Sequence, residues 1–356
     1  MLNNLFKKIA YAFLTLFGVV SVVFFLFTIL PGDPAQMILG QNETQEQRDL
    51  INQKYGFDLP LHEQYILYLN DLSPVSFHST NNSDYTFVDH SKYSLAKILC
   101  FEESCLAVKL PYLRESFQRA GKTVNSVISE TLPNTVVLAF TSICLALFLG
   151  VILGVFSALY KDQFLDQILQ VLATLGMSLP SFFSAVLFAW LFAYVLGDLT
   201  GLNMTGSLYE LDDFGEEYSL QLKNLILPAV VLGIRPLAVV IQLMRNSLLE
   251  TFQQDYIRTA KAKGLSNFKI ILNHALKNSL NPVITAISGW FASLLAGAVF
   301  VEYIFGWNGL GKEIVDALNL LDMPVIMGAV IVIATMFILI NIFVDLIYAK
   351  LDPKVN

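Results

Sequence analysis

The stretch GWNGLGKEIVDA, residues 306–317, contains glycines and a lysine at the spacing of a phosphate-binding loop. In the motif GxxxxGK[ST], backbone N–H groups surround the phosphates and the Ser or Thr hydroxyl binds Mg²⁺. Gly306, Gly311 and Lys312 fit this spacing, but Glu313 stands at the hydroxyl position and brings a negative charge there. A phosphate-binding loop also follows a β-strand, whereas the preceding AVFVEYIF belongs to an apolar segment typical of a membrane helix. We therefore predict that this motif binds no nucleotide.

The composition is that of a membrane protein. Of the 356 residues, 55% are hydrophobic and 14% are charged, whereas soluble domains carry roughly 25% charged residues. A membrane-spanning helix needs about 20 mostly apolar residues. Six segments meet this requirement, namely residues 9–30, 132–160, 168–196, 225–249, 283–305 and 325–348. Prolines are expected in or next to the first turns of four of them (Pro133, Pro228, Pro282 and Pro324), and Pro180 is expected to kink or divide the third.

The segments between the spans differ in charge, and this difference predicts the orientation. Cytoplasmic segments of membrane proteins are enriched in Lys and Arg. One set of segments, including both termini and residues 250–281, contains Lys7, Lys8, Lys161, Arg258, Lys261, Lys263, Lys269, Lys277, Lys350 and Lys354. The short segments of the other set contain only Lys223 and Lys312 and are otherwise acidic. We therefore predict an all-α, polytopic protein with six transmembrane helices, both termini in the cytoplasm, and residues 306–317 on the outer face, where ATP is absent.

These expectations divide the chain into four parts. Residues 1–30 form an N-terminal transmembrane helix, 31–130 an extracytoplasmic loop, 131–350 a core of five transmembrane helices, and 351–356 a cytoplasmic tail. The long loop is expected to be a small cap without chemistry of its own. A disulfide between its Cys100 and Cys105 is left open, because it depends on an oxidising compartment. The Cys and His residues lack the spacing of a metal site, and we expect neither catalytic residues nor nucleic-acid binding.

The cytoplasmic segment QDYIRTAKAKGLSNFKIILNHALKNSLNPV, residues 254–283, is predicted to contain two short helices. Gly264 suits the left-handed position after the first helix, and Ser266 suits the N-cap of the second. Ile257 and Ala260 form a small apolar ridge among basic residues. Such a helix can insert into a groove on a partner protein, or it can serve only as a basic loop at the membrane surface. Its charge does not distinguish these alternatives.

Polar residues inside the spans are candidates for a transport pathway, because charge within a membrane is costly unless it is paired or faces a cavity. Arg235 lies near the middle of the fourth span, Gln242 lies two turns further on, and Glu302 ends the fifth. Arg235 could meet the carboxylate of a passing peptide or could pair with Glu302 and set helix packing. Asp345, late in the sixth span, is expected to be structural.

The run RTAKAKG, residues 258–264, resembles the EAA loop of ABC-importer permeases, which docks on a cytoplasmic ATPase. Further stretches, in chain order, are similar to the dipeptide/oligopeptide/nickel permease family: LPGDPA, YGFDLPLHEQYILYL, ISETLPNTVVLA, MSLPSFF, NSLLE, GAVFVEYIFGWNGLGKEIVDAL and NIFVDLIYAKLDP. Together they cover nearly the whole chain. Two departures are Arg258 and Thr259, where the general pattern has Glu and Ala, and an apparent insertion at about residues 74–109.

The resemblance implies a type I importer fold in a bacterial inner membrane and a function as the permease subunit of an ATP-driven importer of di- or oligopeptides. The implied partners are a homologous second permease, two ATPases, an extracytoplasmic substrate-binding protein and membrane lipid. This chain would bind no cofactor itself, since the ATPases would use ATP and Mg²⁺. The implied ATPase-coupling residues are Asp255, Tyr256, Ile257, Arg258, Thr259, Ala260, Lys261, Ala262, Lys263 and Gly264.

Three alternatives to peptide import remain at this stage. The same scaffold could import nickel or another small solute, because selection in this family rests largely with the binding protein. An ion-coupled transporter acting alone would need buried acids near the membrane midplane, of which the sequence has few. A membrane sensor would be expected to carry a cytoplasmic signalling domain, and only AKLDPKVN follows the last span.

Overall fold

A computed structural model describes residues 2–29, 33–39, 44–81, 84–87, 92–93, 95–101, 104–212, 215 and 217–351. The chain divides into two compact units. The first consists of Met1–Lys8, Thr131–Val315 and Thr335–Asn356, and the second consists of Ile9–Glu130 and Asp316–Ala334. Several helices contribute residues to both units, and each unit is described here by itself.

Among the described residues, five helical segments are long and apolar enough to cross a membrane. Four are the single helices α1 (Leu2–Ile29), α5 (Val124–Leu159), α9 (Lys223–Thr251) and α15 (Met323–Leu351). The fifth runs through α11 (Asn267–Ile270), the π-helical turn η2 (Ile271–Ala275) and α12 (Leu276–Gly297).

The third predicted span is broken at Pro180, as the sequence led us to expect. Helix α6 (Phe164–Ser178) ends before Leu179, and α7 (Ser181–Phe188) continues as the π-helix η1 (Ala189–Val195) at 112° to it. Leu179 is extended, with φ −74° and ψ 133°, because the proline ring disfavours the helical conformation of the preceding residue. In the part of the chain that the structure describes, six segments can span a membrane, as predicted, when this bent pair is counted as one.

The predicted positions of three prolines and the predicted end of the fifth span are wrong. Pro133, Pro228 and Pro282 lie inside helices, and only Pro324 lies in a first turn. The helices begin earlier than their apolar segments because polar residues continue them toward the N-terminus. The fifth span ends at Gly297 rather than at residue 305, and a separate short helix, α13 (Val299–Phe305), follows it.

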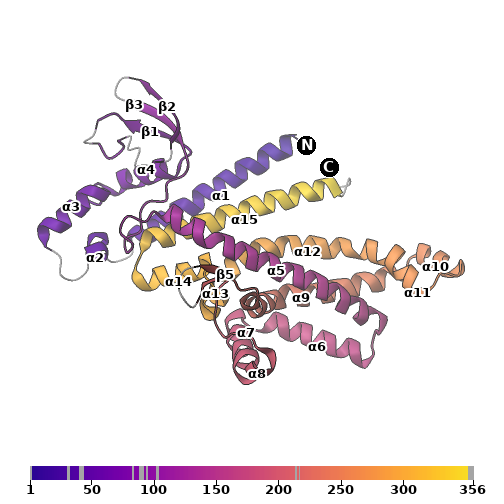
Figure 1. Cartoon of the computed structure of the whole chain (residues 1–356). Coiled ribbons are helices and arrows are strands. Elements are labelled where there is room, and N and C mark those ends of the chain that lie inside the picture. The colour runs from indigo at the N-terminus through magenta and orange to yellow at the C-terminus, as the bar shows by residue number, and fades with distance from the viewer. Residues whose placement is uncertain are drawn as a thin grey trace. The chain divides into compact units, whose positions relative to one another are not determined.

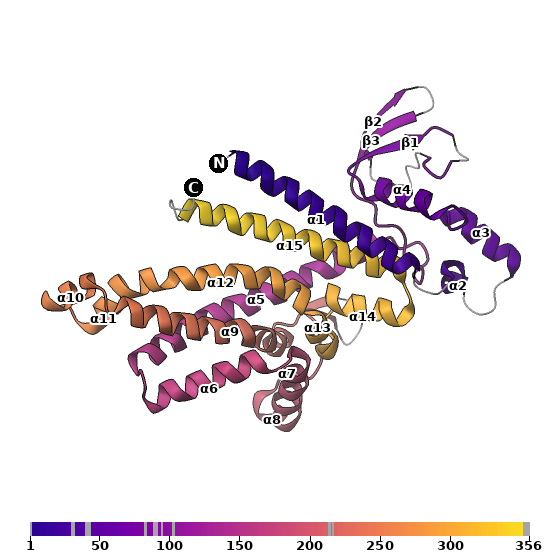
Figure 2. The ribbon, with the colours of Figure 1, turned by 180° about the vertical axis from the view of Figure 1, so that it is seen from behind.

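The first unit is built around α9, which packs against α6 and α12; these helices and α5 lie side by side in both views (Figures 1 and 2). Gly154 of α5 permits the close approach to α9, since a Cβ there would lie 2.6 Å from Cβ of Met244. Small residues commonly allow such close packing between membrane helices. The unit also contains α8 (Gly197–Thr200), the hairpin of β4 (Tyr209–Leu211) and β5 (Tyr218–Leu220), and part of α14 (Leu310–Leu320).

The ends of α1 and α15 that belong to the first unit lie toward the same side as the segment that follows α9 (Figures 1 and 2). This arrangement agrees with the charge distribution, which predicts that both termini and residues 250–281 are cytoplasmic. The predicted tail beyond Leu351 and the side chain of Asp345 lie outside the described part of the chain.

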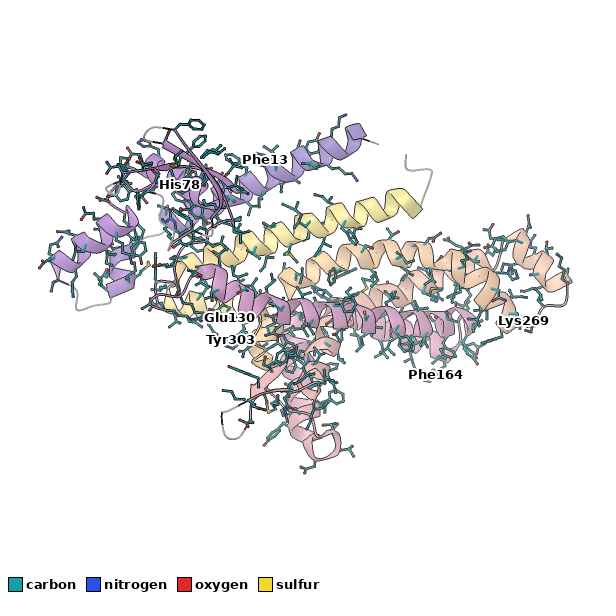
Figure 3. The ribbon with its side chains drawn as sticks, turned by 45° about the horizontal axis from the view of Figure 1, so that its top comes forward. Phe13, His78, Glu130, Phe164, Lys269 and Tyr303 are labelled. Atoms are coloured by element: carbon teal, nitrogen blue, oxygen red, sulfur yellow. A yellow bond between two sulfur atoms is a disulfide. The ribbon has the colours of Figure 1, made fainter. Side chains whose placement is uncertain are left out.

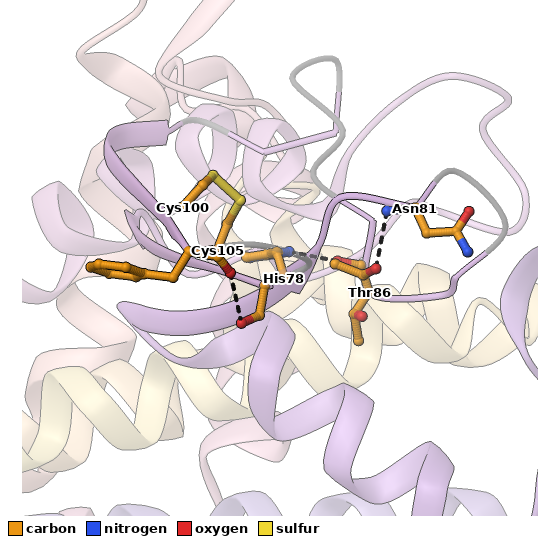
Figure 4. The surroundings of a disulfide bond; sticks show 8 residues. His78, Asn81, Thr86, Cys100 and Cys105 are labelled. Atoms are coloured by element: carbon orange, nitrogen blue, oxygen red, sulfur yellow. Dashed lines mark hydrogen bonds between the residues drawn. A yellow bond between two sulfur atoms is a disulfide. The ribbon is translucent and has the colours of Figure 1, made fainter.

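The second unit contains α2 (Pro34–Leu39), α3 (Gln45–Tyr55), α4 (Leu61–Leu72) and a three-stranded antiparallel sheet. The strands are β1 (Val75–Ser79), β2 (Leu95–Phe101) and β3 (Ser104–Lys109), in the order β1-β3-β2. The protein is mostly helical, as predicted, and this segment adds a small sheet that the sequence analysis did not expect. A disulfide joins Cys100 and Cys105, which are opposed in the register of β2 and β3 (Figure 4), and this settles the pairing that the sequence left open.

Candidate functional site

The predicted coupling segment folds as a helix that ends at a left-handed glycine. Helix α10 (Asp255–Ala262) follows an extended Gln254, and Gly264 has φ +76°. This confirms the helix and the glycine position expected from the sequence. Ser266 occupies the N-cap position of α11, but its side chain makes no capping hydrogen bond. The prediction that a second, separate short helix follows is wrong, because α11 continues into the long helical segment that crosses the membrane.

The apolar ridge of α10 faces the chain's own core. Ile257 is fully buried (0% exposed), and Ala260 lies beside it in the main hydrophobic cluster of the first unit. Both side chains therefore hold α10 in place and are not part of its exposed surface. The exposed face of the segment is instead polar and mostly basic, and consists of Asp255, Tyr256, Arg258, Thr259, Lys261, Ala262, Lys263 and Gly264.

Hydrogen bonds attach this segment to the helices on either side of it. Thr251 at the end of α9 and Ser279 of α12 share a buried hydrogen bond of 2.9 Å between their hydroxyls. The Asn278 amide donates to the Tyr256 hydroxyl over 2.9 Å. The first bond therefore joins α9 to α12 beside the segment, and the second joins α10 to α12. Figure 3 shows Lys269 at the tip of the segment, remote from Tyr303 at the opposite end of the same unit.

Phe268 was missed by the sequence reasoning. It lies on α11 and is highly exposed, and Leu272 one turn later is exposed as well. An apolar pair on a protruding polar segment is a feature of protein interfaces. The sequence signal that could have revealed this pair is the four-residue spacing of Phe268 and Leu272, which places both side chains on one helix face.

Arg235 is exposed on α9 and lines a cavity of about 170 Å³. Ser181 and Ser184 of α7 and Trp290 and Ser293 of α12 contribute further polar and aromatic groups to its wall. Gln242 lies two turns along α9 and is half-buried. The cavity therefore combines one cation with hydroxyl groups, a combination that can accept an anionic or peptide-like group.

Glu302 does not line this cavity. Its side chain is fully buried, and its Oε2 accepts hydrogen bonds from the backbone N–H of Gly311 at 2.7 Å and of Lys312 at 3.2 Å. Within the described residues no ion pair joins Glu302 to Arg235, so the expected pairing is wrong. The expectation that Glu302 belongs to a pathway is not supported either, because its carboxylate is enclosed at the start of α14.

The glycines of the GxxxxGK pattern have a structural explanation in this arrangement. A Cβ on Gly311 would lie 2.6 Å from Cα of Val299 and 2.8 Å from Oε2 of Glu302. The loop thus surrounds an anion, as a phosphate-binding loop does, but the anion is a carboxylate of the same chain. The loop is also tied to α5, since Trp307 donates to the Asn134 carbonyl over 3.1 Å and Leu310 N–H donates to the Thr135 hydroxyl over 2.8 Å.

An ion pair lies toward the cytoplasmic end of the first unit. Arg245 of α9 binds Asp166 of α6 through two hydrogen bonds of 2.7 and 2.6 Å. The Asp166 carboxylate also accepts from the Ser157 hydroxyl at 2.5 Å, and Asp166 is buried. Arg245 therefore has a structural partner and fastens α6 to α9. In the described part of the chain, no group of three or more His, Cys, Asp or Glu residues could hold a metal ion.

Two family models match the chain. Residues 150–356 match the binding-protein-dependent transport system inner membrane component, and residues 1–91 match the N-terminal region of that membrane component. The dipeptide transport system permease protein DppB of Alkalihalophilus pseudofirmus is 31% identical over all of both chains. Its namesake in Escherichia coli K12 is 31% identical over 100% of this chain and 99% of that protein. The Bacillus subtilis DppB is 32% identical over 96% and 94%, respectively.

A solved structure of the MetNI methionine ABC transporter in an inward-facing conformation is also similar to the chain. The similarity covers 64% of this chain and 96% of that chain, with 16% sequence identity and a TM-score of 0.48.

Proposed function

Because the chain belongs to the family of binding-protein-dependent transport system inner membrane components, we propose that it is a permease subunit of an ATP-driven importer of di- or oligopeptides. The observation that carries the proposal is similarity over the full length of the chain to proteins named dipeptide transport permeases. The multiple apolar helices agree with a multi-pass protein of the inner membrane.

The proposed complex contains this chain, a homologous second permease, two cytoplasmic ATPases and an extracytoplasmic substrate-binding protein. The ATPases bind ATP and Mg²⁺ and hydrolyse the nucleotide, and this chain supplies no catalytic group. Residues 255–264 carry the movement of an ATPase to α9 and α12 through the Thr251–Ser279 and Tyr256–Asn278 contacts. Because Ile257 and Ala260 are buried, the ATPase contacts the basic outer face of α10.

Arg235 and Gln242 are proposed to line the translocation pathway. Arg235 is exposed in the unaccompanied chain and borders a cavity on one face of α9. In the assembled importer this face would meet the second permease, so that each subunit forms half of the pathway. Among the described residues Arg235 forms no ion pair, so its guanidinium group can bind the carboxylate of a peptide.

The first experiment is to purify the chain from its native membrane in mild detergent and to identify the proteins that accompany it in stoichiometric amounts. We expect a second permease and ATPase subunits, and the reconstituted complex should import a labelled dipeptide only when ATP and binding protein are present. Isolation of the chain alone, together with transport driven by an ion gradient, would contradict the proposal. Import of another solute but not of peptides would contradict only the proposed substrate class.

A further inference from the structure

The sheet of the second unit presents its apolar side chains outward. Val75 and Phe77 of β1, Leu99 and Phe101 of β2, and Val108 of β3 are exposed, Phe77 to 70% and Phe101 to 71%. The register places Val75 opposite Val108, and it places Phe77 and Leu99 on either side of Leu106. These residues therefore form one continuous surface, which we call the outer sheet face.

The opposite face of the same sheet is buried, and beside the small Cys105 and Ala107 it contains polar side chains. Ser76, His78 and Lys109 are each almost fully buried, and their polar groups are satisfied. Ser76 and His78 share a hydrogen bond of 2.8 Å, the His78 ring bonds the Thr86 carbonyl at 3.0 Å, and Lys109 donates to the Asp71 carbonyl (Figure 4 shows His78 and Thr86). An antiparallel sheet beside water usually places its polar face outward. This sheet has the reverse arrangement, which suits an apolar environment.

Contacts within the second unit attach the sheet to a membrane helix. The Tyr65 hydroxyl of α4 bonds the Ser21 hydroxyl of α1 at 2.6 Å, and the ring of Tyr68 lies 5.3 Å from that of Phe24. At the other end of α4, the Asn70 amide exchanges two hydrogen bonds with the backbone of Phe77, of 2.8 and 2.9 Å. Helix α4 therefore connects α1 to the outer sheet face.

These contacts hold the sheet near the outer part of α1. Ser21 lies eight residues before the end of α1 at Ile29, which is about 12 Å at 1.5 Å per residue. Asn70 is five residues after Tyr65 in α4, about 7 Å along the helix axis. Since the hydrocarbon core is about 30 Å thick, a sheet held this close to the outer part of α1 lies at the level of the lipid headgroups and upper acyl chains.

From these observations we infer that the outer sheet face is a membrane anchor that rests on the outer leaflet of the bilayer. Its lipid-facing residues are Val75, Phe77, Leu99, Phe101 and Val108. Aromatic and aliphatic side chains at the membrane interface stabilise such contacts. The same unit carries further exposed apolar side chains on a membrane helix, namely Phe13, Val22 and Leu26 of α1. The disulfide at the base of the β2–β3 turn holds Phe101 in the strand.

Tryptophan placed at the outer sheet face tests the inference directly. The variants Phe77→Trp and Phe101→Trp are made in the full chain, assembled with its partner subunits. They are placed in nanodiscs of phosphatidylethanolamine and phosphatidylglycerol with or without brominated acyl chains. Both positions are highly exposed, so the larger ring requires no repacking. Phe13→Trp on α1 is the lipid-exposed reference, and Leu50→Trp on the polar helix α3 is the control in the same unit.

We expect bromine to quench the added fluorescence at positions 77 and 101 about as strongly as at position 13, and to leave position 50 unquenched. Quenching at 77 and 101 no greater than at 50 would overturn the inference. Fluorescence that is unquenched and shifts to the blue only when the binding protein is added would also overturn it, and would assign the face to that protein. The readout is independent of transport and does not depend on the proposed substrate.

Discussion

The carboxylate of Glu302 lies 2.7 Å from the backbone N–H of Gly311, at the first turn of α14. The N-terminus of a helix carries partial positive charge and free N–H groups, which favour an anion. The phosphate-like spacing of glycines in this chain thus serves to bring a helix start onto an internal carboxylate. The contact holds α13 and α14 together on the side of the first unit opposite α10.

Replacement of Gly311 by alanine is expected to destabilise the protein. The new Cβ would lie 2.6 Å from a backbone atom, Cα of Val299, and backbone cannot move aside at low cost. We expect a loss of roughly 1–3 kcal/mol, the usual range for overpacking, measured as a lower thermal midpoint of the purified complex in detergent. Gly289→Ala is the matched control, because no atom lies within 4 Å of its added Cβ. Equal stability of the two variants would contradict the role assigned to this contact.

Gly264 should be essential for coupling but not for insertion into the membrane. Its φ of +76° lies in the left-handed region, which costs other residues about 1–2 kcal/mol and is least accessible to β-branched ones. We expect Gly264→Val to abolish uptake while the chain remains in the membrane at normal abundance. Gly264→Asn should retain substantial uptake, because asparagine tolerates this conformation. Normal uptake by the valine variant would count against the coupling assignment.

The Arg245–Asp166 pair is expected to be important for stability. Removal of one partner from a buried ion pair typically costs about 3–5 kcal/mol, because the remaining charge is left without compensation. Arg245→Ala should therefore reduce the amount of detergent-stable protein sharply, since Asp166 is buried. The double variant Arg245→Met with Asp166→Leu should recover much of this loss, because it leaves no uncompensated charge. A double variant as unstable as Arg245→Ala would contradict this interpretation.

The local features of the coupling segment could be predicted from sequence because they depend on neighbouring residues. The extent of α10 and the conformation of Gly264 follow from an amphipathic helix and a glycine. The burial of Ile257 could not be predicted, since an apolar ridge of two residues suits a partner's groove and the chain's own core equally well. The partner of Glu302 was missed because Gly311 is close to it only once α13 and α14 are formed.

The sheet was missed for a different reason. The alternation in VSFHS indicates a strand, but it does not say which face is buried, and the sequence analysis predicted only a small cap for the whole loop. Its apolar side chains point outward, against the usual arrangement of a soluble domain. That reversal becomes visible only when the exposure of each residue is known.

Lys109 should make the stability of the second unit depend on pH. Burial lowers the pKa of its ammonium to about 8 from the ordinary 10.5, more than the nearby Asp71 carboxylate raises it. The unfolded chain therefore binds more protons than the folded chain between these two values, and the contribution of Lys109 to stability increases as pH rises through this window. Comparison of the thermal midpoints of the parent and Lys109→Met from about pH 8 to about pH 10.5 tests this. We expect the parent to gain stability relative to the variant with increasing pH, and a constant difference would refute the assignment.

Arg235→Gln is expected to impair transport without affecting assembly. The side chain is exposed on α9, and among the described residues it forms no ion pair, so its replacement leaves no buried charge uncompensated. A pathway cation that meets the carboxylate of a passing peptide contributes a charge-assisted hydrogen bond, which a neutral amide makes less strongly. Uptake of dipeptides should fall, while the recovery of the complex and its ATP hydrolysis without substrate remain normal. Arg235→Lys, which keeps the charge, should restore part of the uptake. Unchanged uptake of every peptide by Arg235→Gln would exclude this contact, and loss of the assembled complex would instead assign Arg235 to helix packing.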